Sequence, residues 1–198
     1  MTTLYLMRHA ESVANQLRIL GSQSDFPLSE KGKMDAEAIA EKFSRTYDLT
    51  RIISSPLKRA IQTAEPFARL FNLKIETDAN LIEQHLGVFT GMPYEDAKIH
   101  PDYQNDKTKR WNWVPVGGGE SYEMIANRIE RFLESLDHRE DDNKILVVFH
   151  AVAMRLTRAL LEDTIPQYPM EMASNGEIWV TEFTRLKEKH EFSILNLN

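Results

Sequence analysis

Residues 145–150 read Ile-Leu-Val-Val-Phe-His, and this stretch decides the fold class. A run of five apolar residues is typical of a strand that is buried on both faces, as in the middle of a parallel sheet. Residues 151–161 follow directly and carry their apolar side chains at helical spacing. A buried strand that leads straight into a helix indicates an α/β domain built on a parallel sheet.

The same alternation of strand and helix patterns extends outward from this stretch along the chain. Short apolar runs predict further strands at residues 4–7, 51–54, 73–77, 178–183 and 191–195, the last two paired with each other. Apolar spacing predicts helices at residues 29–43 and 121–136. It also predicts a third helix, with Ser55 as N-cap and Pro56 in the first helical position. The inward-facing residues of this helix are Ala60, Ile61, Ala64, Phe67, Ala68 and Phe71. We therefore expect a three-layer sandwich, with helices on both faces of a mostly parallel central sheet, as a single domain over residues 1–198.

The 198-residue chain of 22.9 kDa is acidic overall, with 24 Lys and Arg against 30 Asp and Glu and a formal charge of -6. An acidic protein is a poor general ligand for nucleic acid or for an anionic membrane, so we expect neither as a partner. Positive charge can still be concentrated in a single cleft. The hydrophobic content of 42% is normal for a soluble globular protein.

The sequence contains no cysteine, which excludes a disulfide scaffold, a cysteine nucleophile and thiolate metal sites, and which fits a reducing compartment. The P-loop pattern GxxxxGK[ST], the zinc pattern HExxH and the nucleophile pattern GxSxG are also missing from it. We therefore expect neither a metal nor a cofactor. The N-terminal residues lack the shape of a signal peptide, and no window approaches the ~20 apolar residues of a spanning helix, so we expect a cytoplasmic protein.

Polar residues follow three of the predicted strands. Arg8 and His9 come after strand 4–7, His150 comes after strand 145–149, and Arg59 lies shortly after strand 51–54. Because the carboxyl ends of parallel strands meet at one edge of a sheet, we expect these side chains to converge there. The sequence thus predicts a cationic, histidine-containing site at this edge.

Six segments, in order along nearly the whole chain, carry a resemblance to a known family. They are LYLMRHAESVANQ (4–16), DFPLSEKG (25–32), IISSPLKRAIQTAEPFA (52–68), LIEQHLGVFTG (81–91), GGGES (117–121) and VVFHAVAMR (147–155). Together they resemble the histidine phosphatase superfamily, the phosphoglycerate mutase-like proteins. The stretch from residue 94 to residue 116 resembles nothing strongly.

The resemblance implies a role for each matching residue. His9 would be the nucleophile, Glu83 the proton donor, and His150 would complete the pocket; the residues that would bind phosphate are Arg8, Asn15 and Arg59. Other readings remain open, because Asn15 can cap a helical turn, His150 can be a core histidine, and Glu83 can be a surface residue. The chain also departs from the family by having Ala10 and Ala151 where glycine is usual. The added methyl group costs little stability where the backbone φ is negative and more where φ is positive, and it can also narrow the pocket.

These residue types suit the hydrolysis of a phosphate monoester. Guanidinium groups are planar, permanently charged and bidentate, so they can hold a phosphate dianion. A neutral imidazole nitrogen can attack phosphorus, and the covalent phosphohistidine divides one hard step into two. The leaving alkoxide needs a proton, which a neutral carboxylic acid can supply before it deprotonates the attacking water.

The segment of residues 92–117 is a lid-like insertion that bears on the choice between phosphatase and mutase. A mutase must exclude water, and this segment is short beside the helical insertion typical of mutases, so a phosphatase is favoured. Ser22, Lys107, Arg110 and Ala151 are candidates for contact with the rest of the substrate. Lys107, Lys109 and Arg110 either bind a second anionic group of the substrate or form a solvated basic patch. Tyr94, Trp111 and Trp113 either line an apolar pocket or pack under the segment. Residues 117–119 are predicted to form a turn, and contact with a ligand is the alternative.

We therefore expect a metal-independent phosphomonoester hydrolase that acts on a small phosphorylated metabolite through a phosphohistidine. Phosphoryl transfer as in a phosphoglycerate mutase, and a non-catalytic module that binds phosphate or a phosphoprotein, are the alternatives. The presence of both His9 and Glu83 argues for catalysis. The natural substrate and the oligomeric state, including a homodimer, are left open by the sequence.

Overall fold

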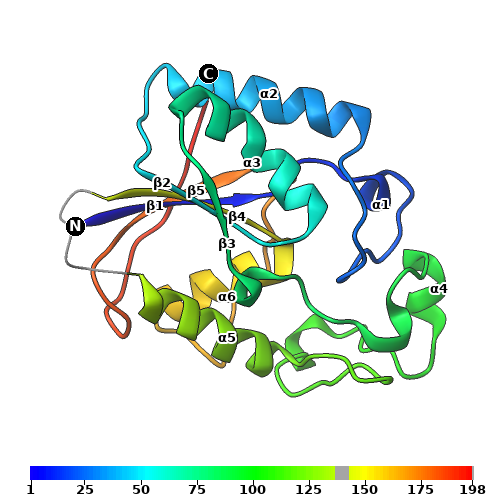
Figure 1. The fold of residues 1–198 in the computed structure, drawn as a ribbon. Helices are drawn as coiled ribbons and strands as arrows, with labels where there is room; N and C mark the ends of the chain where they lie inside the picture. The colour runs from blue at the N-terminus through cyan, green and yellow to red at the C-terminus, as the bar shows by residue number, and fades with distance from the viewer. Residues whose placement is uncertain (137–142, 198) are drawn as a thin grey trace.

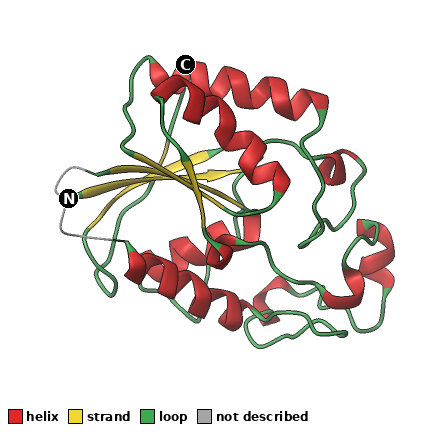
Figure 2. Ribbon diagram, in the orientation of Figure 1, coloured by secondary structure: helices red, strands yellow, loops and turns green. Residues whose placement is uncertain are grey.

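The computed structural model describes residues 1–136 and 143–197, and its centre is a six-stranded sheet (Figure 1 and Figure 2). The strands follow one another across the sheet in the order β3-β2-β4-β1-β5-β6. Their bounds are Thr2–Arg8 for β1, Arg51–Ser54 for β2, Ile75–Thr77 for β3, Lys144–Phe149 for β4, Ile178–Phe183 for β5 and Ser193–Ile194 for β6. Every predicted strand is present, although β3 begins later and β6 is shorter than the sequence pattern indicated.

Strand β4 occupies the middle of the sheet, as its unbroken apolar run predicts. It pairs in parallel with β1 and with β2, and Val148 lies opposite both Met7 and Ser54. Strand β3 extends the parallel part beside β2, whereas β5 runs antiparallel to β1. The carboxyl ends of β1, β2 and β4 therefore meet at one edge, which brings the residues after them together.

Helices cover both faces of the sheet, so the predicted three-layer α/β architecture is confirmed (Figure 1). Helices α2 (Glu30–Ser44) and α3 (Lys58–Phe71) pack on one face, around a cluster that includes Phe43 and Phe67. Helices α5 (Tyr122–Ser135) and α6 (Ala151–Leu161) pack on the other face. Among the described residues, every helix is too short or too polar to span a bilayer.

The start of α3 corrects one prediction. Ser55 and Pro56 have the local chemistry of a helix start, but the helix begins at Lys58, and Leu57 is its N-cap residue. The amide of Lys58 donates instead to Asp25 Oδ1 at 2.6 Å. The Ser55 side chain is thus available for a contact elsewhere. By contrast, Ser29 and Ser121 do cap α2 and α5 as the sequence indicates.

Residues 79–121 run past the carboxyl edge of the sheet mainly as turns and short helices. These are η1 (Ala79–Leu81), η2 (Gly87–Phe89), α4 (Tyr94–Ile99) and η3 (Lys107–Lys109), and α1 (Val13–Gln16) lies near the same edge (Figure 1). Phe89 and Ala97 form a small cluster there, against which Trp113 packs. Gly117 and Gly118 both have positive φ, which identifies residues 117–119 as the turn that precedes α5.

Candidate active site

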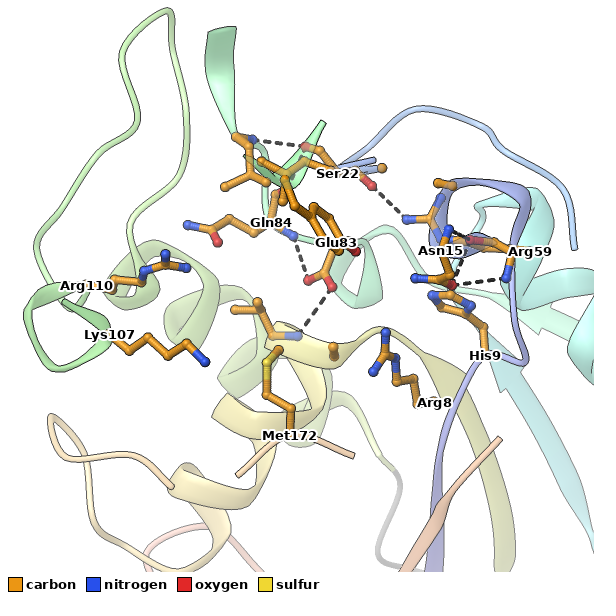
Figure 3. Close-up of a pocket in the computed structure, with 18 of the residues that line it drawn as sticks. Arg8, His9, Asn15, Ser22, Arg59, Glu83, Gln84, Lys107, Arg110 and Met172 are labelled. Atoms are coloured by element: carbon orange, nitrogen blue, oxygen red, sulfur yellow. Dashed lines mark hydrogen bonds between the residues drawn. The ribbon is translucent and has the colours of Figure 1, made fainter. Parts of the chain in front are cut away.

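A cavity of about 400 Å³ opens at the carboxyl edge of the sheet (Figure 3). The structure brings most of the predicted site residues to its wall: Arg8, His9, Asn15, Ser22, Arg59, Glu83, Lys107, Arg110 and Ala151. His150 is fully buried behind this wall, with its ring centre 5.2 Å from that of His9. Segments that are far apart in the sequence therefore meet at one site.

His9 is held by main-chain contacts at the end of β1. Its amide donates to the Phe149 carbonyl, and its Nδ1 lies 2.7 Å from the carbonyl oxygen of Ala10. Because a carbonyl can only accept, Nδ1 carries the proton and Nε2 keeps a lone pair. Burial lowers the pKa of His9 well below its ordinary value, and the Arg59 and Arg8 guanidiniums lower it further. His9 is therefore a neutral imidazole with a lone pair on Nε2.

His150 makes a contact that the sequence did not indicate. Its Nε2 lies 2.7 Å from Ser55 Oγ, which also accepts a hydrogen bond from the Leu57 amide. The hydrogen bonds of the described residues give this hydroxyl no acceptor other than His150, so we assign its proton to Nε2, which leaves the imidazole proton on Nδ1. Burial lowers the pKa of His150 well below its ordinary value, Arg59 and His9 adding to the effect. Within the described residues its Nδ1 is a buried group without a partner.

Arg8 and Arg59 bring positive charge to the cavity, and no carboxylate of residues 1–136 or 143–197 forms an ion pair with either. Arg8 Nη1 donates to the Ala173 carbonyl at 2.7 Å. Arg59 is 3% exposed, and its Nη1 and Nη2 donate to the carbonyls of Ser24 and Ser22 at 2.8 and 2.7 Å. Carbonyls orient a guanidinium but do not cancel its charge. Burial lowers the pKa of both arginines and Glu83 opposes this shift, yet an arginine stays protonated in proteins.

Glu83 lies on the cavity wall between the arginines and the 92–117 segment (Figure 3). Its Oε1 accepts from the Gln84 amide at 2.9 Å, and its Oε2 accepts from the Val152 amide in the first turn of α6 at 3.3 Å. Its carbonyl accepts from Gln23 and Arg128. The carboxyl group is thus held in the cavity from two segments, rather than lying free on the surface.

Asn15 caps a helical turn and also lies on the cavity wall. Its Oδ1 accepts from the amide and hydroxyl of Ser12, which forms a capping box at the start of α1. The same oxygen accepts from Asn175 Nδ2 at 3.2 Å. Since the oxygen is fully engaged, the Asn15 amide nitrogen is the group left to face a ligand.

The two alanines that replace glycine fit without backbone strain. Neither Ala10 nor Ala151 is among the residues with positive φ in the described part of the chain. The Ala10 methyl packs with Leu28 and Ala36, whereas Ala151 lies on the cavity wall. The Ala151 methyl therefore reduces the width of the cavity, and that of Ala10 does not.

Lys107 and Arg110 lie at the end of the cavity away from His9 and Arg59 (Figure 3). The Arg110 guanidinium donates to the Gln104 carbonyl at 3.0 and 2.8 Å. Lys109, which the sequence grouped with these two, lies outside the cavity and pairs with Asp106 at 3.4 Å. Basic residues thus gather at both ends of the cavity.

The aromatic residues of the 92–117 segment have separate roles. Tyr94 lines the cavity, but Trp113 packs with Phe89 and Trp111 stacks on Tyr168. Packing is therefore the correct reading for the two tryptophans. The glycines at 117–119 are likewise outside the cavity wall.

Several residues near the site were not foreseen. Ser55 contacts His150, and Glu120 accepts from Arg128 Nε at 3.0 Å and from the His85 amide. Through the His85 amide, this largely buried ion pair joins α5 to the segment that carries Glu83. Glu120 falls within a motif of the resemblance, but no local pattern marks Arg128 as its partner. Further unpredicted wall residues are Ser12, Leu20, Gln84, Lys98, Tyr103, Asn105, Val152 and Met172.

Curated proteins similar in sequence carry both phosphatase and mutase-like names. The chain is 37% identical to phosphoserine phosphatase 1 of Hydrogenobacter thermophilus over 159 residues, which make up 78% of this chain and 74% of that protein. It is 32% identical to phosphoglycerate mutase-like protein 4 of Arabidopsis thaliana over 155 residues, or 77% of this chain and 67% of that protein.

Solved structures show the same fold. A mycobacterial glucosyl-3-phosphoglycerate phosphatase in complex with VO3 superposes with a TM-score of 0.85 at 25% identity, covering 99% of both chains. Bacillus stearothermophilus YhfR superposes with a TM-score of 0.84 at 25% identity, covering 98% of this chain and 96% of that chain. The family comparison matches residues 4–196, nearly the whole sequence, and so confirms that the chain belongs to the histidine phosphatase superfamily (branch 1).

Proposed function

We propose that the protein is a metal-independent phosphomonoesterase that acts on a small phosphorylated metabolite through a phosphohistidine intermediate. The observation that carries this proposal is the environment of His9. Its Nδ1 proton is held by the Ala10 carbonyl, its Nε2 has a lone pair, and the Arg8 and Arg59 guanidiniums share its cavity. A neutral imidazole beside two fixed cations is suited to attack a phosphate dianion.

In the first step, Nε2 of His9 forms a bond to phosphorus while the bond from phosphorus to the ester oxygen breaks. Glu83 donates its proton to the departing alkoxide, so an alcohol leaves and the enzyme holds a phosphohistidine. Arg8, Arg59, the Asn15 amide and the His150 Nδ1–H stabilise charge on the equatorial oxygens. The Ala10 carbonyl stabilises the positive charge that develops on the imidazole.

In the second step, water attacks phosphorus and the bond from nitrogen to phosphorus breaks. Glu83, now a carboxylate, takes a proton from this water, and the electron pair of the broken bond returns to Nε2 of His9. Inorganic phosphate leaves, and the acid and the nucleophile regain their starting forms. Each atom and charge is thus accounted for by this chain's own residues and water.

The far end of the cavity supports a preference of the protein for substrates with a second anionic group. Lys107 and Arg110 are basic residues at that end (Figure 3), and Ser22 and Ala151 also lie on the cavity wall. A phosphomonoester that carries a second anionic group would have a charged partner at each end. The names of two similar proteins, a phosphoserine phosphatase and a glucosyl-3-phosphoglycerate phosphatase, fit this preference. A cytoplasmic location and a small molecule as partner belong to the same proposal.

The proposal is tested with p-nitrophenyl phosphate and the variant His9→Ala. We expect the wild type to release phosphate and the variant to lose roughly 10⁴-fold or more in kcat, as when a nucleophile is removed. The control is His100→Ala, because His100 lies in the same part of the molecule but outside the cavity wall. An alkaline quench followed by mass spectrometry should detect phosphate on residue 9 in the wild type alone. Equal, negligible turnover by wild type and His9→Ala would favour a binding module instead.

A second assay separates a phosphatase from a mutase. The protein is incubated with 3-phosphoglycerate, and inorganic phosphate and 2,3-bisphosphoglycerate are followed together. We expect phosphate to accumulate without bisphosphoglycerate. Phosphoryl transfer that outpaces hydrolysis would overturn the phosphatase proposal in favour of mutase activity.

A further inference from the structure

The connection between α6 and β5, residues 163–177, contacts both ends of the cavity although it contains no helix or strand. At the phosphate end, its Ala173 carbonyl accepts from Arg8, and its Asn175 Nδ2 donates to the His9 carbonyl at 3.0 Å. The amide of Gly176 donates to the Arg8 carbonyl at 3.1 Å. This connection therefore helps to hold the residues that surround the proposed nucleophile.

A buried arginine fixes the middle of the same connection. Arg155 of α6 is 1% exposed, and its guanidinium donates to the Met170 carbonyl at 2.7 Å and to the Glu171 carbonyl at 3.3 Å. Met172 follows directly and lies on the cavity wall. A buried charge satisfied by two main-chain carbonyls holds the connection against α6, because displacement would leave the charge unpaired.

Tyr168 joins this connection to the far end of the cavity. Its hydroxyl donates to the Lys107 carbonyl and accepts from the Arg110 amide at 3.3 Å. Lys107 is the first residue of the short helix η3 and Arg110 is its C-cap, and both are proposed to meet the substrate's second charge. Its ring stacks on Trp111 at 6.5 Å and meets Tyr122 edge-on at 5.0 Å, which fixes the direction of the hydroxyl.

Most other hydrogen bonds of η3 lie within its own segment and shape the turn. The Thr108 amide and hydroxyl both donate to Asp106, and the Lys109 amide donates to the Asp106 carbonyl. The Arg110 guanidinium donates to Gln104 within the same segment. One further bond leaves the segment, because the Arg110 carbonyl accepts from the Tyr122 amide at 3.4 Å and so ties the end of the turn to α5. The bonds within the segment preserve the turn but do not tie its start at Lys107 to another element. The Tyr168 hydroxyl, by contrast, reaches the turn from a different part of the chain.

We propose that Tyr168 is a positioning residue that sets the distance between the basic far end of the cavity and the phosphate site. Arg155 supports it, because the same connection leads from Tyr168 through Met170 to Ala173 and Arg8. In this role Tyr168 does not touch the substrate, and it acts through the backbone of Lys107 and Arg110. The inference rests on the proposed function for its effect on substrate choice, but its structural part can be measured separately.

The variant Tyr168→Phe removes the hydroxyl and keeps the ring. With 3-phosphoglycerate, which has a second anionic group, we expect KM to rise roughly five- to tenfold as two hydrogen bonds are lost, with kcat nearly unchanged. With p-nitrophenyl phosphate, which has no second anionic group, we expect less than about a twofold change. Tyr47→Phe is the matched control, since Tyr47 packs against Tyr5 and Phe43 in the cluster on the other face of the sheet.

Hydrogen exchange gives a readout that needs no activity. In Tyr168→Phe, amides of residues 105–111 should exchange faster than in the wild type, while those of β1 and β4 are unchanged. Unchanged exchange at 105–111 would overturn the positioning role, as would an equal loss on both substrates together with a lower Tm. If the wild type hydrolyses no phosphomonoester, the proposed function fails, and the exchange experiment still decides the role of Tyr168.

Discussion

The two ends of the cavity are built in different ways. At the phosphate end, His9 and Arg59 are buried, and main-chain groups next to the strand ends or in nearby loops orient them. At the far end, Lys107 is exposed, and Arg110 is held mainly by the carbonyl of Gln104 in its own segment. A rigid sheet edge suits a reaction that needs fixed geometry, whereas a segment with local contacts can vary without disturbing it. The contrast separates the chemistry of the proposed reaction from the choice of substrate.

Replacing the proposed acid should produce the largest effect that depends on the leaving group. Glu83→Gln should lower kcat/KM for glycerol 3-phosphate by roughly 10²–10⁴-fold, because a poor leaving group needs a proton. It should affect p-nitrophenyl phosphate much less, since nitrophenolate leaves unprotonated. Steady-state kinetics on both substrates measures the difference, with the exposed Glu95→Gln as control. Equal losses on the two substrates would remove Glu83 from the role of acid.

Removing a cation at the phosphate end should affect all substrates alike. Arg59→Ala should lower kcat/KM by about 10²–10³-fold, the cost of losing a donor to the transition state. The factor should be the same for p-nitrophenyl phosphate and 3-phosphoglycerate, because both present the same phosphate. Arg69→Ala is the control, since Arg69 lies on the same helix but pairs with Glu37 at the surface. A loss confined to 3-phosphoglycerate would break the division between the two ends.

The buried histidines should make the stability of the protein depend on pH. Burial lowers the pKa of His9 and of His150 from the ordinary 6.5, so below pH 6.5 the unfolded chain binds protons that the folded one does not. The free energy of unfolding should therefore fall as pH drops below 6.5, by up to about 1.4 kcal/mol per pH unit for each histidine. Urea unfolding at pH 7.5, 6 and 5 measures this slope. It should be shallower in His150→Gln but unchanged in His100→Gln, and identical slopes in all three proteins would contradict the prediction.

The smallest effect is expected at the exposed end. Lys107→Met should raise KM for 3-phosphoglycerate by up to about fivefold, since an exposed ion pair is worth about 0–1 kcal/mol. It should leave p-nitrophenyl phosphate unaffected. Lys109→Met supplies the matched control, because Lys109 belongs to the same turn but lies outside the cavity. If Lys109→Met had the same effect as Lys107→Met, general surface charge rather than a defined contact would be responsible.

The layers of the fold were predictable because they depend on local patterns. The apolar run at 145–149 is long enough to identify the central strand, and Ser29 and Ser121 cap helices through residues three positions away. The start of α3 was not predictable, because distant contacts decide it. Asp25 binds the Lys58 amide, and Ser55 binds His150 instead of capping the helix.

The site shows the same limit. Motif residues such as Arg8, His9 and Glu83 could be placed together, because the strand order follows from the fold and the motifs carry a family resemblance. The pairing of Glu120 with Arg128 and the contacts of Tyr168 could not be placed. They depend on which side chains meet across irregular segments, and no spacing in the sequence encodes that.

The position of β4 has a consequence for how the molecule is made. Leu4 of β1 and Arg51 of β2 both pair with Ile145, so β4 lies between β1 and β2. Because β4 follows both strands in the sequence, it is the last of the three to be synthesised. Until it emerges from the ribosome, β1 and β2 have no shared neighbour, and pairings across so many residues close slowly. A nascent chain that stops before this strand would contain Arg8, His9, Arg59 and Glu83 and still be unable to turn over any ester. Catalytic competence would then arrive late, after this strand has carried His150 into place and the connection that holds Arg8 has followed it.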